Sequence, residues 1–152
     1  MREACTKDLD WIWQIEKTTF SASCRNFKST LKYGIEEFPE GFLVEPNCGY
    51  VYSFYIDYPL DDRDHIPNGK CLYICTLAVH PKHRREGIAK KLILDLLERH
   101  KRTTWLVVHE KWTAAIRLYE DLGFELCFKM KNIFGYSDGL YYKHTGSSSA
   151  AE

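Results

Sequence analysis

The middle of the chain holds a basic turn, residues 80–89, which reads His-Pro-Lys-His-Arg-Arg-Glu-Gly-Ile-Ala. It lies between a predicted strand and a predicted helix, and the first N–H groups of a helix have no partner within that helix. The helix dipole favours an anion at the same end. Gly87 and Ala89 are small where a ligand would approach the main chain. Positive charge comes from Arg84, Arg85, Lys90 and Lys91. This pattern predicts a binding site for a pyrophosphate group.

Two familiar phosphate-binding loops do not match this turn. The Gly-x-x-x-x-Gly-Lys-Ser/Thr loop is absent from the sequence, and one glycine cannot supply a Gly-x-Gly-x-x-Gly fingerprint. Basic residues at a helix start also occur in turns that only face solvent. Composition alone leaves both interpretations open.

The elements on either side of the turn position it. Residues 71–79 form a nearly continuous apolar run, which is typical of a strand covered on both faces. Apolar residues then recur at helical spacing from Ile88 to about Lys101, and residues 105–108 form a second short apolar run. A strand, a helix and a strand in this order predict two parallel strands with the helix packed across them.

The rest of the chain predicts further helices and hairpins. A first helix is indicated by residues that share one helical face, Leu9, Ile12, Trp13 and Glu16, with Thr6 or Asp8 as its N-cap. Two more helices are expected at 25–33, ended by Gly34, and at 115–122, ended by Gly123. Antiparallel hairpins are expected at 41–45 with 49–57 and at 124–133 with 140–143, and a loop at 59–70.

Composition and length exclude several classes of protein. The chain has 152 residues, 45% of them hydrophobic, and we expect one domain with its own core over residues 1–144. Twenty-one basic residues balance twenty-one acidic ones, so no net charge attracts nucleic acid or an anionic membrane. No apolar run is long enough to span a membrane and no signal peptide opens the sequence, so we expect a cytoplasmic protein. Residues 145–152 are small and polar and predict a disordered tail.

The six cysteines are interpreted as reduced, mostly buried small residues. No Cys-x-x-Cys pair occurs, and Cys71 and Cys75 have no histidine at a spacing that suits zinc. We therefore expect no bound metal.

Two segments, in order, carry a resemblance to a known family. Leu77-Ala78-Val79 followed by Pro81-x-x-Arg84-x-x-Gly87-Ile88-Ala89 resembles the acetyl-CoA motif of the GNAT superfamily of N-acetyltransferases. Residues 115–124, which read Ala-Ile-x-Leu-Tyr-Glu-x-Leu-Gly-Phe, resemble the second landmark of that superfamily. The resemblance covers nearly the whole chain. Residues 72–77, Ile15-Glu16 and Phe20-Ser21 are most similar to RimI-type N-terminal protein acetyltransferases and their archaeal and eukaryotic relatives.

The resemblance implies a fold, a cosubstrate and a reaction. The fold would be α/β, with a mixed, mostly antiparallel sheet of about six or seven strands, four helices and a splayed parallel strand pair. The pantetheine arm of acetyl-CoA would pair with Leu77, Ala78 and Val79 at the end of the first parallel strand. Its pyrophosphate would bind the main-chain N–H groups of Arg84, Arg85, Glu86, Gly87, Ile88 and Ala89. The acetyl group would pass directly to a primary amine, above all the α-amino group of a protein N-terminus.

Acetyl transfer would need an acid for the departing thiolate and a base for the amine. Tyr119 matches a family tyrosine and is the predicted acid, also placed beside the cofactor; the alternative is a core aromatic. Val107 stands where RimI-like relatives carry a glutamate or a histidine, and valine cannot accept a proton. His109 lies on the same strand face, and Tyr73 matches a tyrosine that positions a water in some relatives. We therefore assign the role of base to Tyr73 and His109 jointly; the alternative for each is a structural or pocket-lining role. The resemblance also implies that a strand N–H near Val79 would donate to the thioester oxygen.

Other residues are expected to contact the acceptor or the cofactor. The predicted acceptor-binding residues are Phe20, Tyr73 and Phe134. Trp112 replaces a family asparagine near the pantetheine, and it either packs on the cofactor or caps the following helix. Residues 1–4 are short for the family's first strand, so we expect that strand to be curtailed.

Three alternative functions remain open on the sequence alone. An RNA-binding module without catalysis would stack bases on one strand face, formed by Tyr50, Tyr52, Phe54 and Tyr58. An acetyltransferase for a polyamine, an aminoglycoside or another small amine would use an acidic loop that contains Asp57, Asp61, Asp62 and Asp64. A cofactor-binding protein without turnover would account for Val107. In each case we expect a monomer or a homodimer.

Overall fold

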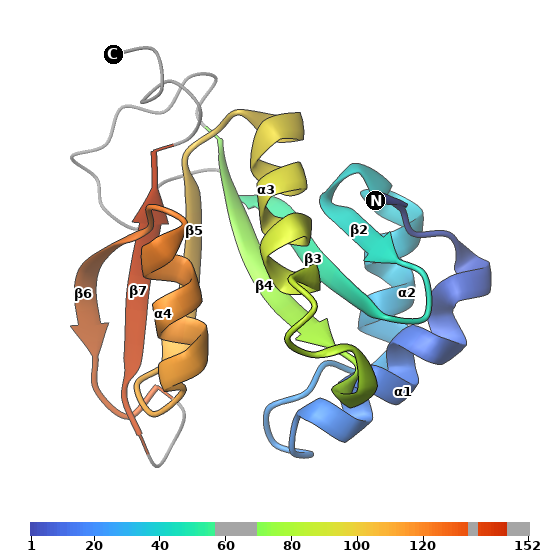
Figure 1. Cartoon of the computed structure of the whole chain (residues 1–152), viewed down its shortest axis with the longest axis horizontal. Coiled ribbons are helices and arrows are strands. Elements are labelled where there is room, and N and C mark those ends of the chain that lie inside the picture. Colours follow the sequence, from blue (N-terminus) through green and yellow to red (C-terminus); the bar gives the residue numbers. More distant parts are fainter. Residues whose placement is uncertain (57–69, 134–136, 146–152) are drawn as a thin grey trace. The chain divides into compact units, whose positions relative to one another are not determined.

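The computed structural model describes residues 1–56, 70–133 and 137–145 (Figure 1). They form two compact units, which are described in turn. No helix among these residues is both long and apolar enough to cross a membrane. The predicted acidic loop, the side chain of Phe134 and most of the predicted tail lie outside the described residues.

The first unit comprises Met1–Phe54 and Cys75–Leu96. Its helices are α1 (Leu9–Thr19), α2 (Lys28–Glu37) and most of α3 (Ile88–His100), and its strands are β1 (Arg2–Glu3), β2 (Phe42–Glu45), most of β3 (Gly49–Ile56) and the second half of β4 (Cys71–Val79). Strands β1 and β3 both pair antiparallel with β2. The short β1 confirms the predicted curtailed strand, and the β2–β3 pair confirms the first predicted hairpin. The core includes side chains without solvent exposure from α1, α2, β2 and β3, among them Ile12, Leu31, Phe42, Val44 and Tyr50.

Strand β3 carries the aromatic face that an RNA-binding module would use, and the core covers it. Tyr50 is 0% exposed and Tyr52 is 6% exposed. The ring of Phe42 stacks on both, at centroid distances of 5.8 and 5.1 Å, and Phe54 packs against the same core. A base cannot stack on rings that are already covered. The predicted RNA platform is therefore wrong in the part of it that is described; Tyr58 lies outside that part.

Helix α2 does not end at Gly34, so the predicted stop is wrong. The helix continues to Glu37, and Gly34 faces β3 from within it. A Cβ atom on Gly34 would lie 2.5 Å from a ring carbon of Tyr52. This glycine is required by close packing against an aromatic ring, which its sequence neighbours do not indicate.

The second unit comprises Tyr55–Ile74 and Leu97–Glu152. It holds the first half of β4, then β5 (Thr104–His109), α4 (Thr113–Asp121), β6 (Glu125–Met130) and β7 (Gly139–His144). Strand β7 lies between β5 and β6 and pairs antiparallel with both, and β6 has a bulge between Leu126 and Phe128. The centre of this core is Trp105, which is fully buried with Cys71 and Tyr141.

Strands β4 and β5 precede and follow α3 in the sequence and form the predicted parallel pair. Leu72, Tyr73 and Ile74 lie opposite residues 104–106, and the two strands continue to Val79 and His109. Across the described residues the strand order is β1-β2-β3-β4-β5-β7-β6. The described residues also form four α-helices. Together with this strand order, they confirm the predicted mixed, mostly antiparallel α/β fold.

Asp8 fastens the N-terminal segment to α1. It occupies the N-cap of that helix, which agrees with one of the two predicted caps, and it is 4% exposed. Its carboxylate accepts hydrogen bonds from the Arg2 guanidinium at 2.8 and 2.9 Å, the Cys5 main-chain N–H at 2.9 Å and the Trp11 indole N–H at 2.9 Å. Burial alone would raise the pKa of Asp8, but these donors outweigh it and hold the pKa well below its usual range.

We expect Asp8→Asn to lower the free energy of unfolding at pH 7 by about 1–3 kcal/mol, because the buried, charged acceptor of four hydrogen bonds is lost. A carboxyl group with a lowered folded-state pKa stabilises the fold above its unfolded pKa, near 3.9, and that contribution disappears as the pH falls toward the folded-state pKa. The gap between wild type and variant should therefore narrow below about pH 4.

Urea denaturation at several pH values measures this gap. Asp10→Asn is the control, because Asp10 lies on the same helix with a side chain that is 91% exposed. A gap that stays constant between neutral and acidic pH would contradict the role of the Asp8 charge.

Candidate active site

The turn between β4 and α3 has a backbone suited to an anion. After the short 3₁₀ helix Pro81–His83, the φ angles of Arg85 and Gly87 are 66° and 78°, both left-handed. Left-handed residues among extended or helical ones turn successive N–H groups toward one concave side. Helix α3 begins at Ile88, where the first N–H groups have no intrahelical partners. The main chain of residues 84–89 can therefore present several donors to one anion.

Hydrogen bonds hold this turn to the strands next to it. The Arg84 Nε donates to the Val79 carbonyl oxygen at 3.1 Å. The His80 N–H donates to the Cys48 carbonyl oxygen in the β2–β3 hairpin at 2.7 Å, and His80 Nδ1 accepts from the Lys82 N–H at 3.0 Å. These bonds fix the two ends of the turn before any ligand binds.

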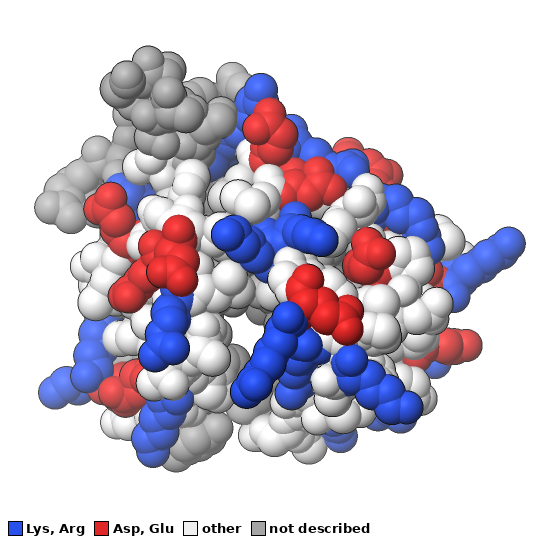
Figure 2. Space-filling model, in the orientation of Figure 1, with Lys and Arg blue, Asp and Glu red and all other residues white. Residues whose placement is uncertain are grey.

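The surface over the turn is basic but not uniformly so. The exposed cations are Lys82, Arg84, Arg85, Lys90 and Lys91. Figure 2 shows Lys and Arg side chains gathered over the turn and the adjoining end of α3, with acidic side chains beside them. One of the acids, Glu86, lies 3.3 Å from Nδ1 of His83. The positive charge is therefore local, in a chain whose formal net charge is zero.

Gly49 lets the end of β4 and the start of α3 approach β3 closely. A Cβ atom on Gly49 would lie 3.0 Å from the Ala78 carbonyl oxygen, 3.2 Å from a Val79 methyl carbon and 3.3 Å from an Ile88 methyl carbon. Ala78 is 4% exposed, while Leu77 and Val79 are half-buried. The predicted cofactor residues of β4 and α3 thus come together around one glycine.

The first unit also holds one predicted acceptor-binding residue. Phe20 ends α1, and its N–H donates to the Glu16 carbonyl oxygen at 3.0 Å. Its half-buried ring packs against the core cluster of this unit. Phe134, which is predicted to share the same task, lies outside the described residues.

Tyr119 lies on α4 in the second unit and is 8% exposed. The helix is closed just after it, because Gly123 has a φ of 96° and donates to the Glu120 carbonyl, while the Phe124 N–H donates to the Tyr119 carbonyl. The Phe124 ring packs against Tyr119 with a centroid distance of 5.8 Å. Burial raises the pKa of Tyr119 above its ordinary value, so the phenol keeps its proton at neutral pH and can donate it.

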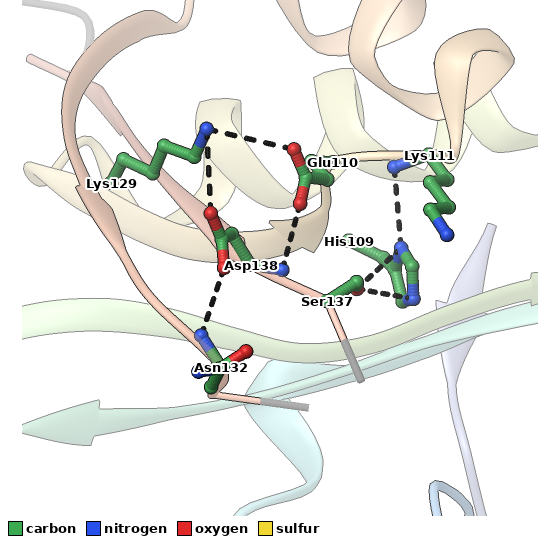
Figure 3. Close-up of polar contacts among 7 residues, drawn as sticks. All are labelled: His109, Glu110, Lys111, Lys129, Asn132, Ser137 and Asp138. Carbon is green, nitrogen blue, oxygen red and sulfur yellow. Dashed lines mark hydrogen bonds and ion pairs between the residues drawn. The ribbon is translucent and has the colours of Figure 1, made fainter. Parts of the chain in front are cut away.

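His109 ends β5 and is 2% exposed (Figure 3). Its Nδ1 accepts from the Lys111 N–H at 3.2 Å, so the ring proton belongs on Nε2. The Ser137 hydroxyl oxygen lies 2.6 Å from Nε2 and 3.1 Å from Nδ1. His109 can therefore accept a proton only at the expense of the bond from Lys111.

Tyr73 is separated from His109 along the sheet. It is half-buried against the Cys71–Trp105–Tyr141 cluster, as is Val107, and its partner on β5 is Trp105. His109 follows Trp105 by four residues, which is about 13 Å at the usual rise of a strand. The two predicted base residues share a sheet face but are not adjacent on it.

Trp112 begins α4 at the N-cap position and is 42% exposed. Its ring stacks on His109 with a centroid distance of 5.3 Å and an interplanar angle of 16°. Its N–H donates to the His109 carbonyl oxygen at 2.9 Å. Of the two predicted roles, Trp112 fills the N-cap position, and it also covers one face of the predicted base.

A polar group that the sequence analysis missed lies next to His109 (Figure 3). Lys129 on β6 lies 3.6 Å from the Glu110 carboxylate and 3.4 Å from the Asp138 carboxylate. Glu110 accepts from the Asp138 N–H at 2.9 Å, and Asp138 accepts from the Asn132 N–H at 2.9 Å. That main-chain donor and Lys129 lower the pKa of Asp138. The group fastens both ends of the β6–β7 connection to the end of β5.

Glu16 is a second polar residue to which the sequence analysis assigned no role in the site. It is fully buried, and the sequence did place it on the inward face of the first helix, where a carboxylate is unusual. No comparable signal marks Glu110, Lys129 and Asp138, because they come from three segments: the residue after β5, β6 itself and the residue before β7.

Among the described residues, no group of three or more His, Cys, Asp or Glu side chains is arranged to hold a metal ion.

Comparison with known proteins bears on the family and the fold. The model of the acetyltransferase (GNAT) family matches residues 25–124. The alanine N-acetyltransferase of ribosomal protein bS18 from Escherichia coli (strain K12) is 39% identical over 67 residues, which are 41% of this chain and 45% of that protein. The match thus spans less than half the length of this relative.

Solved structures with a similar fold include two from eukaryotic and archaeal sources. NAA60 from Arabidopsis thaliana, in complex with a bisubstrate analogue, has a TM-score of 0.81 at 20% identity, and 95% of each chain is covered. Ard1 from Thermoplasma volcanium has a TM-score of 0.78 at 21% identity, again with 95% of each chain covered. At these identities the likeness establishes the fold.

We expect Gly87→Ala to weaken the binding of coenzyme A about 5- to 20-fold, because a left-handed alanine costs about 1–2 kcal/mol and favours a turn whose N–H groups no longer converge. No atom lies within 4 Å of the added methyl group, so the effect comes from the backbone alone. Isothermal titration measures the affinity.

Gly123→Ala is the matched control, since its φ of 96° imposes the same kind of strain at the end of α4. It should lower the thermal stability as much as Gly87→Ala does but leave the affinity for coenzyme A unchanged. Equal losses of affinity in both variants would remove the turn from the binding site.

Proposed function

This chain belongs to the acetyltransferase (GNAT) family, and we propose that it transfers the acetyl group of acetyl-CoA directly to the α-amino group of a protein N-terminus. The observation that carries the proposal is the pair of left-handed residues, Arg85 and Gly87, in the turn between β4 and α3 within the matched region. Such a backbone can turn successive N–H groups toward one anion, which supports a site for the pyrophosphate. The named activity of the partly matching bS18 relative supports the choice of acceptor.

We assign the binding of acetyl-CoA to the first unit. The N–H groups of residues 84–89 hold the pyrophosphate, and the main chain of residues 77–79 pairs with the pantetheine arm. The hydrogen bond from Arg84 Nε to the Val79 carbonyl oxygen holds the turn against the end of β4. The N–H near Val79 donates to the thioester oxygen, whose negative charge grows as the amine attacks. The cosubstrate supplies the activated acetyl group.

Tyr119 acts as the acid in the proposed reaction. The amine nitrogen bonds to the acetyl carbon, the bond from that carbon to sulfur breaks, and the Tyr119 hydroxyl donates to the departing sulfur. Burial raises its pKa, so the phenol keeps its proton at neutral pH and acts by donating a hydrogen bond to the sulfur, although the same rise makes it a weaker acid than an exposed phenol. The phenol is buried on α4, which keeps bulk water from competing for the donor.

Tyr73 and His109 are proposed as the groups that receive the proton of the amine, through water where needed. His109 Nδ1 already accepts a hydrogen bond from the Lys111 N–H, and this bond must break before Nδ1 can take a proton. Phe20, Tyr73 and Phe134 are proposed to contact the acceptor, and Trp112 is proposed as a further contact of the cofactor. We further propose one catalytic domain over residues 1–144, which works in the cytoplasm as a monomer or homodimer without a metal.

The proposed acceptor is tested with a panel of amines incubated with acetyl-CoA and read as free thiol, with mass spectrometry of the product. We expect turnover of peptides that begin with Met, Ser or Ala. The same peptides with a blocked N-terminus and an internal lysine are the matched controls and should not react. Turnover of spermidine or an aminoglycoside in place of every peptide would replace the proposed acceptor by a small amine.

We expect Tyr119→Phe to lower kcat about 100-fold, within the range for loss of a general acid, while the affinity for acetyl-CoA is kept. Steady-state kinetics and titration with acetyl-CoA measure the two quantities. Tyr142→Phe is the control, because Tyr142 is equally buried but its hydroxyl donates to Glu120 at 2.7 Å. An unchanged kcat in Tyr119→Phe would exclude Tyr119 as the acid.

A further inference from the structure

The carboxylate of Glu16 is buried without solvent exposure in the first unit, and its partners are neutral donors. The Tyr50 hydroxyl donates to one oxygen in a short hydrogen bond. The main-chain N–H of Asn26 donates to the other oxygen at 2.7 Å, and the Asn26 side-chain amide does so at 3.1 Å. A buried carboxylate costs free energy unless such bonds compensate it, and an apolar residue would fill the same space at less cost.

Asn26 extends this group to β4. Its Nδ2 donates to the Thr76 hydroxyl at 2.7 Å, the Thr76 hydroxyl donates to the Cys75 sulfur at 3.6 Å, and the Cys75 thiol donates to Asn26 Oδ1 at 3.7 Å. The three side chains thus close a ring of hydrogen bonds, in which each group is both donor and acceptor. Such a satisfied network restricts the motion of the side chains that it joins.

The two ends of this group belong to segments with different proposed tasks. Asn26 lies in the α1–α2 connection, residues 20–27, which begins with the predicted acceptor-binding Phe20. Thr76 directly precedes residues 77–79 on β4, which are the predicted partners of the pantetheine arm. The connection and the strand lie 50 residues apart in sequence at the Asn26–Thr76 bond.

We propose that Glu16 is a positioning residue for the acceptor: it holds the α1–α2 connection on Thr76, so that the acceptor meets the acetyl group in a fixed place. This inference rests on the proposed acetyl transfer to peptides. The charge on Glu16 matters because two donors of Asn26, its main-chain N–H and its amide, converge on one carboxylate oxygen. A glutamine in its place has the same shape but presents an amide group with one weaker acceptor.

The test separates positioning from plain stability by comparing KM with kcat. In Glu16→Gln we expect KM for an acceptor peptide to rise about tenfold, kcat to change less than about threefold, and the affinity for acetyl-CoA to stay the same. Hydrogen exchange of residues 20–27 should become faster in the same variant, while exchange in β2 and β3 should not. Asp10→Asn is the matched control, because it removes an exposed carboxylate of the same helix whose ion pair, with Lys28 at 3.0 Å, links α1 to α2 without reaching Thr76; it should behave as wild type.

Thr76→Val provides a second variant if Glu16→Gln does not fold, because it removes only the far end of the group. It should raise KM for the peptide in the same direction by a smaller factor. A KM for the peptide equal to that of Asp10→Asn in the folded variants, or a fall in kcat alone, would overturn the positioning role. If wild type itself acetylates no peptide in this assay, the proposed function fails, and the positioning role fails with it.

Discussion

Two left-handed residues, Arg85 and Gly87, determine whether the main chain between β4 and α3 can bind an anion. Glycine adopts this conformation freely, but arginine does so at a cost of about 1–2 kcal/mol and keeps it only where its surroundings impose it. Those surroundings are the bond from Arg84 to the end of β4 and the bond from His80 to the β2–β3 hairpin. The close approach at Gly49 adds to them. The hairpin, β4 and α3 of the first unit therefore all contribute to one turn.

Two polar groups fasten the connections that the resemblance links to the acceptor, and they differ in their physical nature. The first group consists of Glu16 with Tyr50, Asn26 and Thr76. The Glu16 carboxylate is buried among neutral donors, where a low dielectric strengthens each hydrogen bond and makes the loss of one partner costly. The second group consists of Lys129 with Glu110 and Asp138 in the second unit. Its side chains are more exposed to solvent and attract one another as ion pairs, so added salt weakens them. The hydrogen bonds that hold the α1–α2 connection are therefore less sensitive to salt than the ion pairs that Lys129 forms at the β6–β7 connection.

Local signals in the sequence predicted most of the fold. The apolar runs around the turn, the turn residues of the first hairpin and Gly123 all act through near neighbours, and each prediction is confirmed. Gly34 and the tyrosines of β3 misled, because a ring from a distant strand packs on that glycine and the core covers those tyrosines. The proposed role of Tyr119 came from resemblance, and that of His109 came from its strand face and its imidazole chemistry. Their burial and partners depend on Ser137, Lys111 and Phe124, which no spacing in the sequence brings together.

The valine at position 107 is compatible with an α-amino acceptor for a reason of acid–base chemistry. An α-amino group has a pKa near 8, whereas an alkyl amine like that of lysine has one near 10.4, so the α-amine is neutral about 300 times more often at pH 7. An apolar neighbour lowers the pKa of an approaching ammonium group by desolvation, while a carboxylate in the same place would raise it. His109, tied to the Lys111 N–H, is poorly placed to deprotonate a strongly basic amine. In the proposed site, Val107 and the restrained His109 would therefore favour the amine that needs the least help to lose its proton.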